Sequence, residues 1–132
     1  MSDRLQRIVE RMAIQPGDRI LEIGCGHGVA VSLMGEYLKT GYITAIDRSP
    51  RMIESAKRRN AKLVASRRAE FITTEFEEFD PGDVRFDKIL AVRVGLFHRE
   101  PDRARQLASR WLGANGKLFV EYDEPEIPLS HR

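Results

Sequence analysis

Cysteine is almost missing from this 132-residue sequence, which contains only Cys25. A single cysteine excludes an internal disulfide and fits a reducing compartment. Long apolar runs are missing too, since none approaches the roughly 20 residues of a membrane span, and the first residues lack the hydrophobic core of a signal peptide. We therefore expect a cytoplasmic protein that does not enter a membrane.

The composition gives little support to metal or nucleic-acid binding. The three histidines and one cysteine lack the spacing of a metal site. A net charge of +2 is too small to imply a nucleic-acid partner. With 42% hydrophobic and 32% charged residues, the sequence predicts one globular domain over residues 1–132, with a leading helix in 1–15 and a proline-interrupted tail in 123–132.

The most informative stretch that is present is residues 20–28, ILEIGCGHG. An apolar, strand-like run ends in Gly24, Gly26 and Gly28, and a helical pattern begins at Val29. A strand, a glycine loop and a helix form nucleotide sites in open α/β sheets, because glycine lets backbone and ligand approach closely. In the dinucleotide pattern G-x-G-x-x-G the third glycine comes one residue later, at the place that Val29 occupies. A nicotinamide dehydrogenase is therefore disfavoured.

Helices and strands are predicted to alternate along the rest of the chain. Apolar residues at helical spacing predict helices over 3–13, 29–40, 50–65 and 101–112. Apolar runs bounded by turn residues predict strands at 20–23, 42–46, 70–74, 86–92 and 117–122. This alternation predicts an α/β fold of three αβα layers, in which an open, mainly parallel sheet lies between two layers of helices.

Together these motifs resemble the class I S-adenosylmethionine-dependent methyltransferases. Glu22 and the three glycines form the E-x-G-x-G-x-G of that family's motif I. Asp47, the pair Phe86-Asp87 and the segment WLGANGKLFV at 111–120 fall where the family has its later motifs. The resemblance covers residues 16–122 and implies a Rossmann-like sheet with strand order 3-2-1-4-5. The family's strands 6 and 7 have no counterpart in this sequence, so part of the usual substrate wall would be missing.

The resemblance implies S-adenosylmethionine as cofactor and S-adenosylhomocysteine as product. It places the methionine part of the cofactor in the glycine loop, oriented by the acidic residue of motif I, and the adenine beside the residues that follow the second and third strands. The implied cofactor-binding residues are Glu22, Gly24, Cys25, Gly26, Gly28, Asp47, Arg48, Met52, Glu75, Phe76 and Ala91. Glu75 would receive the adenine amino group, with Glu77 as a substitute, and a solvated acidic turn is the other interpretation of this stretch.

Asp47 is also assigned from the residues themselves. It follows the second predicted strand, close to the offset of about 20 residues at which doubly wound folds hold the ribose hydroxyls. A carboxylate can accept hydrogen bonds from both hydroxyls. Helix capping is the alternative role, but Ser49 and Pro50 already supply a cap and a first helical residue.

Methyl transfer from a sulfonium is an in-line displacement, so alignment and exclusion of water matter more than any one side chain. His98, after the fourth predicted strand, is the candidate general base for a phenol or alcohol acceptor, and the alternative is a surface histidine that caps the next helix. Glu121 and Asp123 are further candidates. We expect transfer to an oxygen, nitrogen or carbon nucleophile of a small molecule. A non-catalytic S-adenosylmethionine-binding module and an RNA methyltransferase that uses the basic residues of 57–68 remain as alternatives.

The predicted fifth strand would form an exposed edge of the sheet. Leu118, Phe119 and Val120 on such an edge favour pairing with another chain. We therefore expect either a homodimer formed near this strand or a tail that folds back over it.

Overall fold

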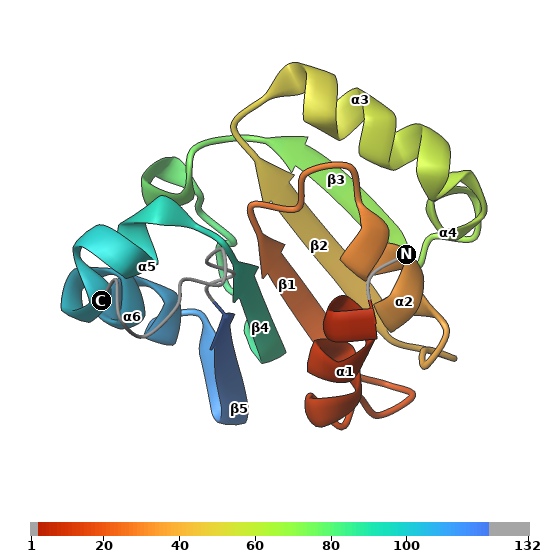
Figure 1. The fold of residues 1–132 in the computed structure, drawn as a ribbon. Helices are drawn as coiled ribbons and strands as arrows, with labels where there is room; N and C mark the ends of the chain where they lie inside the picture. The colour runs from red at the N-terminus through yellow and green to blue at the C-terminus, as the bar shows by residue number, and fades with distance from the viewer. Residues whose placement is uncertain (1–2, 122–132) are drawn as a thin grey trace, which may run out of the picture.

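The computed structural model describes residues 3–121, and the predicted tail, including Asp123, lies outside them. The described residues form a five-stranded sheet in the order β3-β2-β1-β4-β5, with helices on both faces (Figure 1). Every neighbouring pair of strands is parallel. The predicted fold class and strand order are both confirmed.

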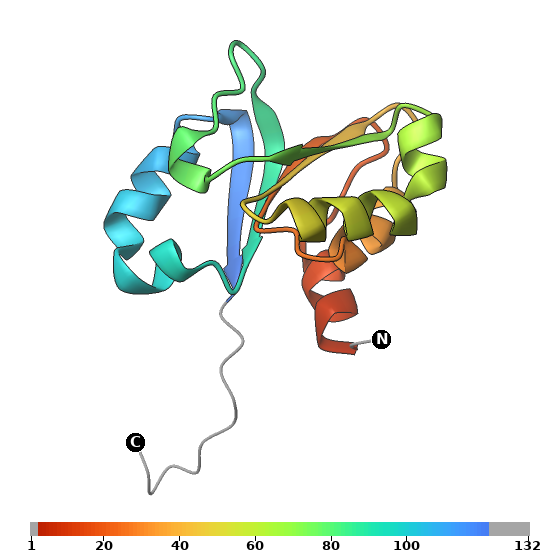
Figure 2. The same ribbon diagram turned by 90° about the horizontal axis from the view of Figure 1, so that it is seen from above.

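The elements follow one another in the predicted alternation. The strands are β1 (Arg19–Ile23), β2 (Tyr42–Asp47), β3 (Ala69–Thr73), β4 (Phe86–Val92) and β5 (Leu112–Glu121). The helices are α1 (Asp3–Arg11), α2 (Val29–Gly35), α3 (Pro50–Arg59), α4 (Ala61–Ala65), α5 (Gly95–Arg99) and α6 (Pro101–Ser109), with the short 3-10 helix η1 at Phe76–Glu78. Figure 2 shows α1 to α4 on one side of the sheet and α5 and α6 on the other.

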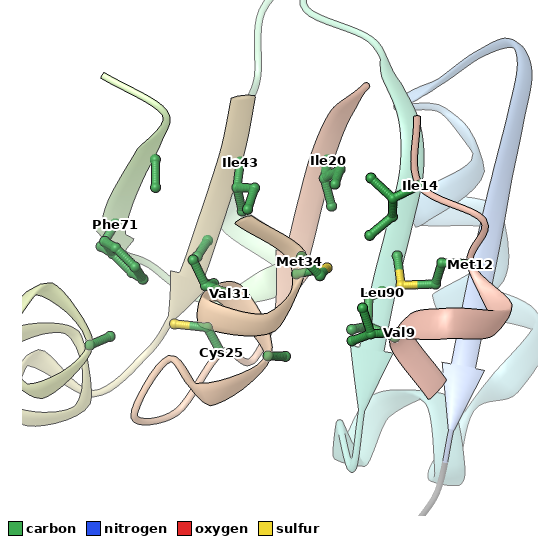
Figure 3. Close-up of a cluster of buried hydrophobic side chains, with 14 of the residues drawn as sticks. Val9, Met12, Ile14, Ile20, Cys25, Val31, Met34, Ile43, Phe71 and Leu90 are labelled. Carbon is green, nitrogen blue, oxygen red and sulfur yellow. The ribbon is translucent and has the colours of Figure 1, made fainter. Parts of the chain in front are cut away.

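Alternation along the strands divides the core into two clusters, because successive side chains of a strand point to opposite faces. Ile20 of β1 belongs to the cluster under α1 and α2, together with Val9 and Met34 (Figure 3). Leu21 belongs to the cluster on the opposite face, together with Trp111, which is buried as its apolar helical stripe predicts. The leading helix therefore packs on the sheet, through Ile8, Val9 and Met12.

Three predicted boundaries are wrong. The expected helix over 50–65 is broken between α3 and α4 at Asn60, whose side chain is buried. The strand expected at 117–122 begins earlier, at Leu112, with an irregular register opposite Phe86–Lys88. The helix expected over 29–40 ends earlier, at Gly35, and Gly41, which follows the predicted helix, has no left-handed backbone; a side chain there would collide with the Asp18 carbonyl, so close packing explains that glycine.

The two edges of the sheet are β3 and β5. Within the described residues β5 pairs only with β4, and Leu118, Phe119 and Val120 are half-buried. None of the described helices has the length and apolar character needed to cross a membrane.

Candidate functional site

A cavity of about 280 Å³ opens at the carboxyl ends of the strands, the usual place for a ligand in an open α/β sheet. Its wall comes from the residues that end or follow β1, β2, β3 and β4, together with α5. The lining residues are Ile23, Gly24, Ile46, Asp47, Arg48, Thr74, Glu75, Phe76, Glu77, Arg93, Val94, Gly95, Leu96 and Arg99. Five residues of the predicted cofactor set thus line this cavity, namely Gly24, Asp47, Arg48, Glu75 and Phe76, whereas Gly26 does not.

The end of β2 holds the glycine loop by its amides. The N–H groups of Gly24 and Cys25 both donate to the Ile46 carbonyl at 2.9 Å. The following amide, that of Gly26, donates to Oδ2 of Asp47 at 2.9 Å. Parallel pairing of β1 with β2 therefore brings the loop and the acidic residue into direct contact across the 21 residues that separate them.

Asp47 is half-buried and keeps acceptor capacity toward the cavity. Its Oδ1 accepts from the Ser49 amide at 2.9 Å, while the Ser49 hydroxyl caps α3 by accepting from the Met52 amide at 3.2 Å. The helix cap is therefore Ser49, as its position before Pro50 predicts. Each carboxylate oxygen of Asp47 accepts one backbone bond, which leaves a lone pair on each for a further donor such as a hydroxyl.

The glycines of the loop serve different purposes. A Cβ on Gly26 would meet nothing within 4 Å, so the loop is open at this residue. Gly28 has φ +81°, and a Cβ there would lie 2.7 Å from Asn60 Nδ2 and 2.9 Å from the Ala56 Cβ. Gly28 does not line the cavity; helix packing and a left-handed backbone explain why glycine stands there.

Glu22 lies beneath the loop and does not line the cavity. The residue is 3% exposed, and its Oε1 has no hydrogen-bond partner among residues 3–121. Burial raises the pKa of this carboxyl well above its ordinary value, and the negative charge of Asp47 raises it further. Burial of Glu22 therefore favours the protonated, neutral form of its carboxyl.

Cys25, Met52 and Ala91 also lie off the cavity wall. Cys25 packs in the first apolar cluster (Figure 3), and burial raises the pKa of its thiol, with the charges of Glu22 and Asp47 adding to the effect. Burial and a raised pKa both disfavour the reactive thiolate form of Cys25. Met52 is half-buried on α3, and Ala91 is fully buried in the second cluster.

The residues that follow β4 differ most from the predicted site. His98 lies in α5, exposed and off the cavity wall, whereas Arg93 and Arg99 line the cavity, although the sequence did not single out Arg99. Arg93 has φ +57°, a left-handed backbone that is uncommon for a residue with a side chain and that clusters at functional sites. Arg93 opens the segment 93–98 after the fourth predicted strand, which the family resemblance places beneath the transferable methyl group.

The acidic stretch after β3 lines the cavity and also makes packing and ion-pair contacts with the neighbouring helices. Phe76 is buried and stacks on Phe97 with ring centroids 5.4 Å apart. Glu75 and Glu77 both line the cavity, and Glu77 is ion-paired with Arg103 at 2.6 Å. Among the described residues no group of three or more His, Cys, Asp or Glu side chains is arranged to hold a metal ion.

Comparison with known proteins gives a family match over most of the chain. The family model of methyltransferase domains matches residues 20–116. The (S)-coclaurine N-methyltransferase of Papaver somniferum is 30% identical over 123 residues, which cover 89% of this chain and 33% of that protein. The putative methyltransferase YrhH of Bacillus subtilis (strain 168) is 28% identical over 88% of this chain and 63% of its own length. The probable (S)-tetrahydroprotoberberine N-methyltransferase 2 of Papaver bracteatum is 25% identical, and the chain spans only 31% of its length.

Solved structures match the fold. A SAM-dependent methyltransferase from Thiobacillus denitrificans, in complex with S-adenosyl-L-homocysteine, superposes with a TM-score of 0.78 at 21% identity, covering 91% of this chain and 48% of that one. Coclaurine N-methyltransferase bound to N-methylheliamine and SAH superposes with a TM-score of 0.76 at 23% identity, covering 89% and 34%.

Proposed function

Because this chain belongs to the family of S-adenosylmethionine-dependent methyltransferase domains, we propose that its cavity binds S-adenosylmethionine and that the domain transfers the methyl group to a small molecule. The observation that carries the proposal is the hydrogen bond from the Gly26 amide to the carboxylate of Asp47, a residue that lines the cavity. It joins the two features, glycine loop and strand-end carboxylate, that a nucleoside carrying an amino acid requires.

The residues present fit such a cofactor. Asp47 has free lone pairs for the ribose hydroxyls, and the loop is open at Gly26. Arg48 and the pair Glu75-Phe76 would hold the adenine, from the two strand ends beside Asp47. The bound cofactor supplies an electrophilic methyl group on a sulfonium, and the protein's part is to orient the acceptor and exclude water.

A small-molecule acceptor is supported by the names of several relatives, which are N-methyltransferases of small plant compounds. A non-catalytic cofactor-binding module is the second candidate. It is supported by the position of the predicted base, because His98 does not line the cavity. This chain spans only about one third of the length of the plant relatives, which also supports a binding module.

Calorimetry with S-adenosylhomocysteine tests cofactor binding, the step that both candidate functions share, and turnover of any acceptor then separates an enzyme from a binding module.

The matched test of Asp47 compares the binding of adenosine with that of 2′-deoxyadenosine. The wild type should bind adenosine about 10-fold more tightly, the value of one hydrogen bond to a charged acceptor, whereas Asp47→Asn should lose most of this preference. No binding of S-adenosylhomocysteine, or an equal preference in both proteins, would refute the assignment.

We also propose a homodimer formed through the edge of β5 that has no partner strand among residues 3–121, on the argument that an unpaired strand edge with apolar side chains favours pairing. Light scattering over a concentration series tests it. A dimer whose population falls in Phe119→Lys would support the proposal, and a monomer at high concentration would exclude it.

A further inference from the structure

Asn60, at the break between α3 and α4, is a residue to which the family motifs assign no role. The apolar pattern predicts a continuous helix through this point, yet Asn60 has φ −110° and ψ 32° and is 4% exposed. A buried amide destabilises the fold unless its hydrogen-bonding groups are satisfied. Its partners therefore explain both the burial and the break.

The Asn60 amide is satisfied by the back of the glycine loop. Its Nδ2 donates to the Gly28 carbonyl at 3.0 Å and to the Ala56 carbonyl at 3.0 Å. Its Oδ1 accepts from the Ser32 hydroxyl at 2.7 Å. Both N–H donors and the oxygen of the Asn60 side chain thus have hydrogen-bond partners. An ionised aspartate has the same shape but no donor.

The neighbouring residue of α3 holds the neighbouring carbonyl of the loop. Arg59 Nε donates to the His27 carbonyl at 3.2 Å, and the His27 ring lies 2.9 Å from the Ser55 hydroxyl through Nδ1. The loop is therefore fixed from both sides, its amides by the end of β2 and its carbonyls by the end of α3.

A loop with three glycines is costly to order, since fixing one residue costs about 1–2 kcal/mol of conformational free energy. Contacts that order the loop before the ligand arrives remove this cost from binding. We infer that Asn60 is a positioning residue of the cofactor loop: through the Gly28 carbonyl it holds the loop in its ligand-binding shape and so raises affinity for the cofactor. This inference rests on the proposed function of the cavity.

The test compares Asn60→Asp, which keeps the shape and removes both donors, with Lys88→Met, a control that breaks the buried ion pair between Lys88 and Asp18 at the opposite end of the sheet. Affinity for S-adenosylhomocysteine and for adenosine is measured by calorimetry at a temperature where all variants are folded. Adenosine lacks the amino-acid part that the loop is expected to hold. Asn60→Asp should weaken S-adenosylhomocysteine about 10-fold, the effect of losing one buried hydrogen bond, and adenosine by less than about 3-fold. Lys88→Met should change neither affinity.

An unchanged affinity for S-adenosylhomocysteine, or an equal loss for both ligands, would overturn the inference while leaving the proposed function intact. If the wild type binds neither ligand, the proposed function fails and with it the effect of Asn60 on cofactor affinity, and amide exchange then decides whether Asn60 holds the loop in its shape. Asn60→Asp should then speed exchange at residues 24–28 while exchange in β4 keeps its rate, and equal rates in the two proteins would overturn it. Should Asn60→Asp not fold, Ser32→Ala, which removes the hydroxyl that orients the amide, serves in its place with the same readouts.

Discussion

Replacing Glu22 by glutamine should change how the stability of this protein depends on pH. Glu22 is buried beneath the glycine loop, with one oxygen unpartnered within the described part of the chain. Burial, and next the charge of Asp47, raise its pKa. Above the ordinary pKa of a glutamate, the folded protein therefore keeps a proton that the unfolded chain has lost. Stability must then fall as the pH rises, until the folded-state pKa is passed.

The size of the effect follows from the proton count alone. One proton held by the folded state and not by the unfolded state changes the free energy of unfolding by about 1.36 kcal/mol per pH unit. Between pH 5 and pH 7 the wild type should lose up to about 2.7 kcal/mol relative to Glu22→Gln on this ground. With about 4 °C per kcal/mol, the glutamine variant should gain up to about 10 °C in Tm over the wild type across this interval.

Urea unfolding followed by the fluorescence of the single tryptophan, Trp111, measures this difference, because Trp111 is buried and becomes exposed on unfolding. The control is Glu54→Gln, at an exposed position on α3, which should follow the wild-type profile. Parallel profiles for Glu22→Gln and the wild type between pH 5 and pH 7 would show that Glu22 ionises normally in the folded state. The reasoning from burial would then be wrong.

Three further outcomes are expected. Gly26→Ala should cost about 1 kcal/mol of backbone strain and should abolish calorimetric binding of S-adenosylhomocysteine. The control is Gly82→Ala, also at a left-handed glycine with open space around it, which should leave binding unchanged. Equal binding by both variants would contradict the assignment of the site. Lys88→Met should destabilise the protein by about 3 kcal/mol in urea, because it leaves the Asp18 carboxylate unpaired, and a loss under 1 kcal/mol would count against that pair. Cys25 should react with a thiol reagent far more slowly in the folded protein than in urea, since burial raises its pKa; similar rates would show that it is accessible.

Much of the fold follows from local patterns. Apolar runs followed by glycines, and strands alternating with helical stretches, predict a parallel sheet whose strand ends gather one side of a ligand site. Asp47 was found in this way, because its distance from the glycine loop is set by one helix and one strand. The boundary of β5 was missed, since residues 113–116 carry a turn-like sequence, and only the pairing of Leu112 with Phe86 includes them in the strand as an irregularity.

The sequence by itself determined the alternation of strands and helices, the glycine loop and the strand-end carboxylate, because these depend on residues close together in the chain. The strand order was predicted from the resemblance to the methyltransferase family. Only the tertiary structure decided which side chains meet. The Asn60 amide finds the Gly28 carbonyl 32 residues away, and Arg93 and Arg99 reach the cavity wall while His98 does not. Such contacts depend on how helices pack across a sheet, and no spacing along the chain encodes that geometry.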